Sequence, residues 1–233
     1  MDNDTILYVA FIFSVILALH LFSDIDWGQE SVQAVKPPAI DDELKEKFPW
    51  RQWRERPAPL VIRGGDPVLR AFMRTITVVE SNSARPYNIL YGGSYVEDLH
   101  HHPDRCIRIR NGPERGNCTT AAGRYQVLRG TWGEIADRYH PNTNQDQASS
   151  LYDFSPGYQD MVVHRWLQDS AYWGCDLSDA LESRGLKRAM IRCPRVVDTW
   201  PSLPGGDQPN VLTSETLEVF EDMLTEERRN ARR

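Results

Sequence analysis

The stretch from Asp66 to Glu80, DPVLRAFMRTITVVE, constrains the fold more than any other part of this sequence. Asp66 is a suitable N-cap, Pro67 suits the first helical position, and apolar residues then recur at helical spacing. We therefore expect an amphipathic helix whose apolar face is covered by other elements. At about 100° per residue, Glu80 lies within about 20° of Leu69 and Met73 around the helix. The sequence thus predicts a carboxylate on the buried face of a helix C-terminus.

Burial disfavours the charged form of a carboxylate, and the negative end of the helix dipole adds to this effect. Both raise the pKa of Glu80, so that the side chain can stay protonated near neutral pH and act as a general acid. The alternative is an ordinary glutamate in a frayed last turn, facing water or Arg85.

The whole chain has 233 residues, of which 40% are hydrophobic, so it can form one compact domain with a core and some attachments. Its formal net charge of -6 does not favour nucleic-acid binding, which normally needs clustered Lys and Arg.

Residues 6–22 contain no charged side chain and are long enough for a short membrane span. A cleaved signal peptide is the alternative, but residues 1–5 carry no basic residue. The faint cleavage pattern at residues 32–34 lies far downstream. We expect a retained signal anchor. Its orientation is not marked by flanking charges, because the first basic residue after it is Lys36.

Four cysteines fall into two pairs that are close in sequence, Cys106 with Cys118 and Cys175 with Cys193. In an oxidising compartment this pattern is compatible with two disulfides. Four buried free thiols are the alternative. A zinc site is less favoured, because neither pair has the spacing of a zinc-binding motif.

The remaining pattern divides the chain into further segments. Residues 1–5 form an N-terminal tail, residues 23–65 a proline-rich and charged tether with Trp50 and Trp53, residues 66–225 a folded domain, and residues 226–233 a basic tail. Turn residues between 84 and 120, with a hairpin signal at Asn111-Gly112, predict a small antiparallel β element. Helical patterns follow after Gly123, Pro156 and Thr213. We expect an α+β protein with a mainly helical body, a small antiparallel β lobe and one N-terminal transmembrane helix.

Five stretches occur in one order: VVESNSARPYNILYGG, HHP, TAAGRYQ, DFSPGYQD and WPSLPGG. Together they resemble the lambda-type phage endolysin family, lysozyme-like lytic transglycosylases that cut the glycan strands of peptidoglycan. The resemblance covers roughly residues 66–224. It implies a lysozyme-like fold, an enzyme that needs no metal or other cofactor, and peptidoglycan as the partner.

The resemblance places the family's catalytic glutamate on Glu80, although both flanking positions depart from the family pattern. It also implies substrate binding by Tyr87, Tyr125 and Gln126, which would line a saccharide groove. Packing and capping at the start of a helix is the alternative role for this turn, and the one we prefer for Arg124.

In the implied reaction, Glu80 protonates the oxygen between N-acetylmuramic acid and N-acetylglucosamine. The muramic O6 hydroxyl then closes a 1,6-anhydro ring. Glu97, Asp98 and Asp104 lie in the β lobe, where a second carboxylate would support hydrolysis instead. A membrane-tethered module that binds the cell wall without cleaving it is a further alternative to the transglycosylase and the hydrolase.

Together with the anchor, the resemblance implies a single-pass inner-membrane protein with its catalytic domain on the periplasmic side.

Overall fold

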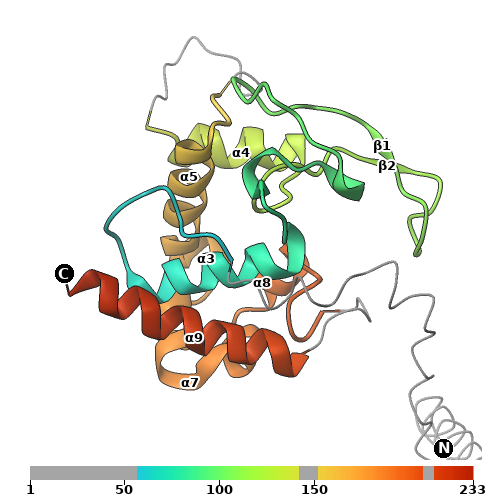
Figure 1. Cartoon of the computed structure of the whole chain (residues 1–233). Helices are drawn as coiled ribbons and strands as arrows, with labels where there is room; N and C mark the ends of the chain where they lie inside the picture. Colours follow the sequence, from blue (N-terminus) through green and yellow to red (C-terminus); the bar gives the residue numbers. More distant parts are fainter. Residues whose placement is uncertain (1–56, 142–151, 207–212, 233) are drawn as a thin grey trace, which may run out of the picture. The chain divides into compact units, whose positions relative to one another are not determined.

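The computed structural model describes residues 57–141, 152–206 and 213–232. Its first α-helix is α3 (Pro67–Glu80), followed by two short 3-10 turns, η2 (Pro86–Asn88) and η3 (Tyr91–Gly93). The strands β1 (Ile107–Arg108) and β2 (Cys118–Thr119) come next. The remaining helices are α4 (Arg129–Tyr139), α5 (Pro156–Gln168), α6 (Ser170–Trp173), α7 (Leu177–Arg192), α8 (Pro194–Thr199) and α9 (Thr213–Ala231). The predicted α+β class, with a mainly helical body and a small antiparallel β lobe, is confirmed (Figure 1).

Helix α3 begins as the sequence predicts. The side chain of Asp66 accepts a hydrogen bond of 2.8 Å from the backbone N–H of Val68, and Pro67 occupies the first turn. Residues 68, 69, 71–73 and 76 of the helix are buried apolar side chains. The helix ends at Glu80, where the N–H of Ser81 donates to the carbonyl of Thr77. Helix α3 therefore begins at the predicted residue and buries the predicted apolar face.

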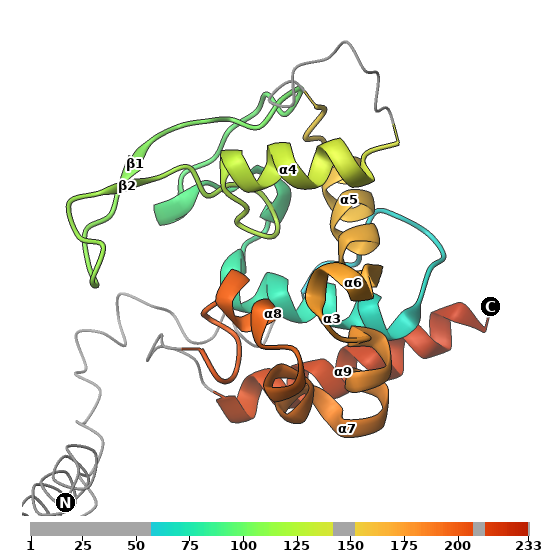
Figure 2. The same cartoon turned by 180° about the vertical axis from the view of Figure 1, so that it is seen from behind.

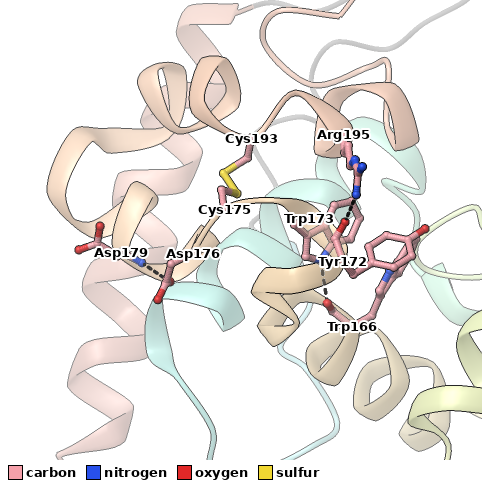
Figure 3. The surroundings of a disulfide bond; sticks show 8 residues. All are labelled: Trp166, Tyr172, Trp173, Cys175, Asp176, Asp179, Cys193 and Arg195. Carbon is pink, nitrogen blue, oxygen red and sulfur yellow. Dashed lines mark hydrogen bonds between the residues drawn. A yellow bond between two sulfur atoms is a disulfide. The ribbon is translucent and has the colours of Figure 1, made fainter.

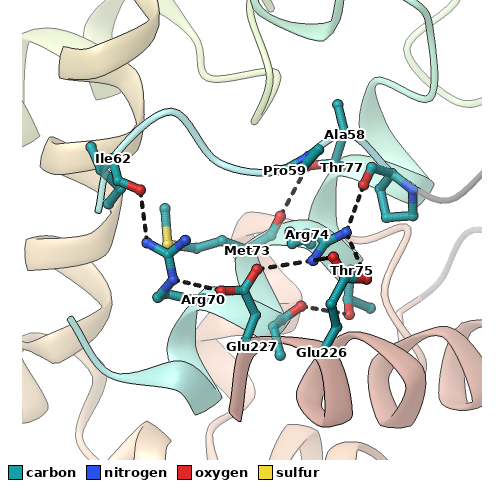
Figure 4. A network of polar contacts seen from close by, with 12 residues as sticks. Ala58, Pro59, Ile62, Arg70, Met73, Arg74, Thr75, Thr77, Glu226 and Glu227 are labelled. Carbon is teal, nitrogen blue, oxygen red and sulfur yellow. Dashed lines mark hydrogen bonds and ion pairs between the residues drawn. The ribbon is translucent and has the colours of Figure 1, made fainter. Parts of the chain in front are cut away.

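Helix α3 packs against α9, α5 and α7. Two of its arginines extend to α9: Arg70 Nε lies 2.7 Å and Arg74 Nη1 2.9 Å from carboxylate oxygens of Glu227 (Figure 4). Arg74 and Glu227 are 1% and 2% exposed, so this ion pair is buried. Residues 226–231, which the sequence analysis assigned to a basic tail, continue α9 as far as Ala231.

The chain just before α3 also packs on the body. Leu60 belongs to the hydrophobic core, and the carbonyl of Pro57 accepts 2.9 Å from Arg74. The carbonyl of Ile62 accepts 3.0 Å from Arg70 (Figure 4). The described end of the predicted tether, residues 57–65, thus packs on the folded domain and supplies backbone carbonyls that accept hydrogen bonds from Arg70 and Arg74 of α3.

The β lobe contains a two-stranded antiparallel hairpin, in which Ile107 pairs with Thr119 and Arg108 with Cys118. The predicted Asn111-Gly112 turn lies between the strands, and Gly112 has φ 86°, which favours glycine. A disulfide joins Cys106 and Cys118 across the base of the hairpin. The predicted pairing of these cysteines is confirmed.

The second predicted disulfide, Cys175–Cys193, is confirmed as well (Figure 3). It joins the residue after α6 and Gly174 to the end of α7, beside a buried aromatic cluster that includes Trp166 and Trp173. The indole N–H of Trp173 donates 2.6 Å to the carbonyl of Trp166 (Figure 3). The disulfide therefore fastens the end of α7 to the chain that follows α6.

No helix in the described ranges is long and apolar enough to cross a membrane. The predicted anchor at residues 6–22 and the Trp50 and Trp53 stretch lie outside those ranges.

Candidate active site

Glu80 is the last residue of α3, and its side chain is half-buried. Its Oε1 atom is shielded from solvent and has no hydrogen-bond partner among the residues that the structure describes. The hydroxyl of Ser202 donates a hydrogen bond to the carboxylate. The predicted position of Glu80 on the apolar side of a helix end is confirmed.

Burial raises the pKa of Glu80 from 4.5 to about 7, and the hydrogen bond from Ser202 opposes this rise only in part. The physical cause is desolvation, because a charged carboxylate loses favourable hydration when it is enclosed by apolar groups. No charged side chain among the described residues contributes to the shift. Glu80 can therefore be protonated or ionised near neutral pH, and burial rather than a neighbouring charge sets this balance.

Ser202 is a residue of the site that the sequence analysis did not single out. It lies in the loop after α8, within the WPSLPGG stretch. In the same loop, the indole N–H of Trp200 donates 2.9 Å to the carbonyl of Tyr125. The loop therefore contacts both the glutamate and the turn that carries Tyr125.

The turn from Gly123 to Gln126 is bonded directly to the end of α3. The hydroxyl of Ser81, the residue after Glu80, donates 2.6 Å to the carbonyl of Arg124. Gly123 has φ 73°, and a Cβ atom there would lie 2.3 Å from Oε1 of Gln159, so only glycine fits. Gln126 also adopts a positive φ, 45°, which is uncommon for a residue with a side chain.

Gln126 is half-buried, and its side-chain amide donates 2.9 Å to the carbonyl of Gly123 and 3.3 Å to that of Ile89. These bonds hold the side chain against the β lobe and leave its amide oxygen as an acceptor for a ligand. Its role in substrate binding stays a prediction.

Tyr87 and Tyr125 are buried, with 8% and 1% exposed surface. Their hydroxyls donate 2.8 Å and 2.6 Å to the carboxylate of Asp160, on α5. Burial, together with the charge of Asp160, raises the pKa of both tyrosines well above the usual range, so they remain hydrogen-bond donors. In this arrangement neither ring presents a face to solvent, and the predicted contact of these tyrosines with sugar stays a prediction.

Arg124, which we expected to have a packing role, is fully buried and lies over the ring of Tyr87. Its guanidinium donates 2.7 Å to Thr77 Oγ1 on α3 and 2.7 Å to the Tyr87 hydroxyl, and also bonds the carbonyls of Ala58 and Pro59. Tyr87 thus links the buried positive charge of Arg124 to the negative charge of Asp160. This network fixes the 123–126 turn against α3 and α5.

The three other acids that we considered in the β lobe have partners of their own. Glu97 pairs with Arg85 at 2.6 Å, and Asp104 pairs with Arg129 at 3.0 Å. Asp98 accepts 2.9 Å from the N–H of His100. None of them affects the pKa of Glu80.

Within the described ranges there is also no group of three or more His, Cys, Asp or Glu placed to hold a metal ion.

The site has a protonatable glutamate at the end of α3, beside the hydrogen-bonded 123–126 turn. This arrangement is typical of enzymes that use acid–base catalysis. The Endolysin family model matches residues 70–226. The chain therefore belongs to the Endolysin family, which consists of peptidoglycan-degrading enzymes, and the resemblance inferred from the five ordered stretches is confirmed.

Two solved structures are similar to this chain. Bacteriophage lambda lysozyme complexed with a chitohexasaccharide is 22% identical, with a TM-score of 0.48, and the match covers 70% of this chain and 97% of that one. A second structure of lysozyme from bacteriophage lambda is 19% identical, with a TM-score of 0.45 and coverage of 72% and 97%. A comparison with curated proteins found no match.

Proposed function

We propose that this chain is a peptidoglycan lytic transglycosylase in which Glu80 is the single general acid and base. The observation that carries the proposal is the raised pKa of Glu80, about 7, in a site where no other described carboxylate affects it. An acid with this pKa is protonated often enough at neutral pH to donate, and its conjugate base is strong enough to accept.

In the proposed reaction, Glu80 donates its proton to the oxygen that links C1 of N-acetylmuramic acid to N-acetylglucosamine. The bond between C1 and this oxygen breaks, and the muramic O6 attacks C1. The O6 proton passes to Glu80, which restores the acid. The products are a free N-acetylglucosamine 4-hydroxyl and a 1,6-anhydro-muramic end, and no water is consumed.

Hydrolysis is the competing reaction of the same site. A hydrolytic glycosidase usually places a second carboxylate about 5 to 10 Å from the acid, as a nucleophile or to activate water. The absence of Glu97, Asp98 and Asp104 from the causes of the raised pKa of Glu80 favours the intramolecular reaction, because a second carboxylate close to the acid would raise that pKa further through its own charge.

We also propose that the domain acts on the periplasmic side of the inner membrane, held by residues 6–22. The two disulfides support this location, because disulfides persist in oxidising compartments.

The test is muropeptide analysis after incubation of purified sacculi with the full-length chain in water labelled with oxygen-18. Wild type should release anhydro-ended products without the label, and Glu80→Gln should release none. Glu97→Gln is the matched control and should remain active, because this carboxylate is exposed and paired with Arg85. Labelled, non-anhydro products would instead establish hydrolysis, and a fully active Glu80→Gln variant would refute the assignment of Glu80. Binding of sacculi without any release would support a non-catalytic wall-binding module.

A further inference from the structure

The β hairpin carries a cluster of arginines that the proposed reaction does not use. Arg105, Arg108, Arg110 and Arg115 are all exposed. No described side chain forms an ion pair with any of them: the nearby Asp104 pairs with Arg129, and Glu114 bonds Asn117. We call residues 105–118 the arginine hairpin. Its four arginines outnumber its one acid, Glu114, so the segment is positively charged, although the whole chain has a net charge of -6.

The arginine hairpin presents these charges on a fixed scaffold. Ile107 packs against the hydrophobic core, so Arg108 points to the opposite face of β1. Arg110 follows two residues later and is exposed as well. The disulfide between Cys106 and Cys118 closes the base of the hairpin. Little conformational entropy is therefore lost in ordering the backbone when a ligand binds there.

The hairpin is continuous with the candidate active site. Strand β2 leads into the 123–126 turn, whose Arg124 carbonyl accepts from Ser81 beside Glu80. The N–H of Tyr91 donates 3.0 Å to the carbonyl of Ala121, which fastens the root of the hairpin to the β lobe. In Figures 1 and 2 the hairpin projects from the β lobe on the side of the molecule where α3 ends.

We infer that the arginine hairpin binds the carboxylates of the stem peptides that branch from a peptidoglycan strand held at Glu80. This inference rests on the proposed function. Guanidinium groups form paired, charge-assisted hydrogen bonds with carboxylates, and they hold their charge at any physiological pH. The hairpin therefore makes the enzyme prefer peptidoglycan to a neutral glycan, independently of the bond that Glu80 cleaves.

The test compares Arg108→Gln/Arg110→Gln with a matched control, Arg184→Gln/Arg188→Gln, which removes the same charge from exposed positions of α7. Each full-length variant is assayed at low salt on native sacculi and on sacculi whose carboxylates have been converted to amides with a carbodiimide and ammonia. On native sacculi the hairpin variant should lose roughly fivefold in kcat/KM, as expected for the loss of a few exposed ion pairs. On amidated sacculi it should match wild type, and the control variant should match wild type on both.

Binding of chitohexaose, a neutral glycan, checks that the groove of the hairpin variant remains intact, and its affinity should not change. Loss on both sacculus preparations, or on neither, would overturn the inference. Loss of binding to phosphatidylglycerol vesicles with unchanged sacculus cleavage would assign the hairpin to a membrane surface instead. If wild type fails to cleave native sacculi, the proposed function fails. Co-sedimentation with the two preparations still tests the hairpin, since wild type should bind native sacculi more tightly than the hairpin variant does.

Discussion

Replacing Glu80 with glutamine removes the ionisable group but keeps the size of the side chain. In wild type, burial raises the pKa of Glu80 from 4.5 to about 7. The folded state therefore binds the proton more tightly than the unfolded state does. A group with a raised pKa contributes its full stability below the unfolded pKa, and that contribution is lost as the pH rises through the folded pKa.

The magnitude follows from the same values. A change of pKa from 4.5 to about 7 corresponds to about 3 kcal/mol of differential stability. At about pH 4 the glutamic acid is protonated in both states, so the glutamine variant and wild type should be almost equally stable. At about pH 8 wild type holds a buried charge, and Glu80→Gln should be more stable by about 3 kcal/mol. The substitution that abolishes the proposed activity should thus stabilise the fold.

The assay is denaturant unfolding of the full-length, oxidised chain at the two pH values, followed by the fluorescence of the buried tryptophans Trp132, Trp166 and Trp173. Glu97→Gln is the control: the hydrogen bond from Arg85 lowers the pKa of this exposed carboxylate, so its removal should give no gain in stability at high pH. If the stability difference between Glu80→Gln and wild type is the same at both pH values, the raised pKa and the argument built on it are refuted.

Two further predictions concern the scaffold. Glu227→Gln removes the buried carboxylate that pairs with both Arg70 and Arg74, and it leaves Arg74 with only the more exposed Glu226, 3.1 Å away. It should cost about 3 kcal/mol of unfolding free energy, whereas Glu182→Gln, in the exposed pair with Arg228, should cost less than about 1 kcal/mol. Equal effects in denaturant unfolding would contradict this ranking. Reduction of the disulfides, whose cysteines are 12 and 18 residues apart, should cost about 3 kcal/mol for each. Thermal melting with and without dithiothreitol measures the loss, and an unchanged melting temperature would exclude it.

Local sequence patterns predicted much of the framework. The N-cap at Asp66 and the apolar spacing of α3 determine its start and its buried face, because these depend on neighbours within a few turns. The Asn111-Gly112 turn and both disulfides are also short-range features. Helices α7 and α8 were not predicted: the apolar residues of α7 form only a weak amphipathic pattern, and the helix is interrupted by Gly185, which has φ 71°.

The contacts that give Glu80 its chemical environment are long-range. Ser202 reaches Glu80 from a loop more than a hundred residues further along the chain. The Asp160 carboxylate accepts hydrogen bonds from Tyr87 of the β lobe and from Tyr125 of the 123–126 turn. No periodicity in the sequence specifies such partners, because they meet only after the helices have packed.

The sequence by itself therefore determined that this chain places a carboxylate at the end of an amphipathic helix, on its apolar side, within a chain of the Endolysin family. Only the tertiary structure decided how far that carboxylate is desolvated and what touches it. The physical reason is that helix position depends on the spacing of nearby residues, whereas desolvation depends on everything that packs around the group.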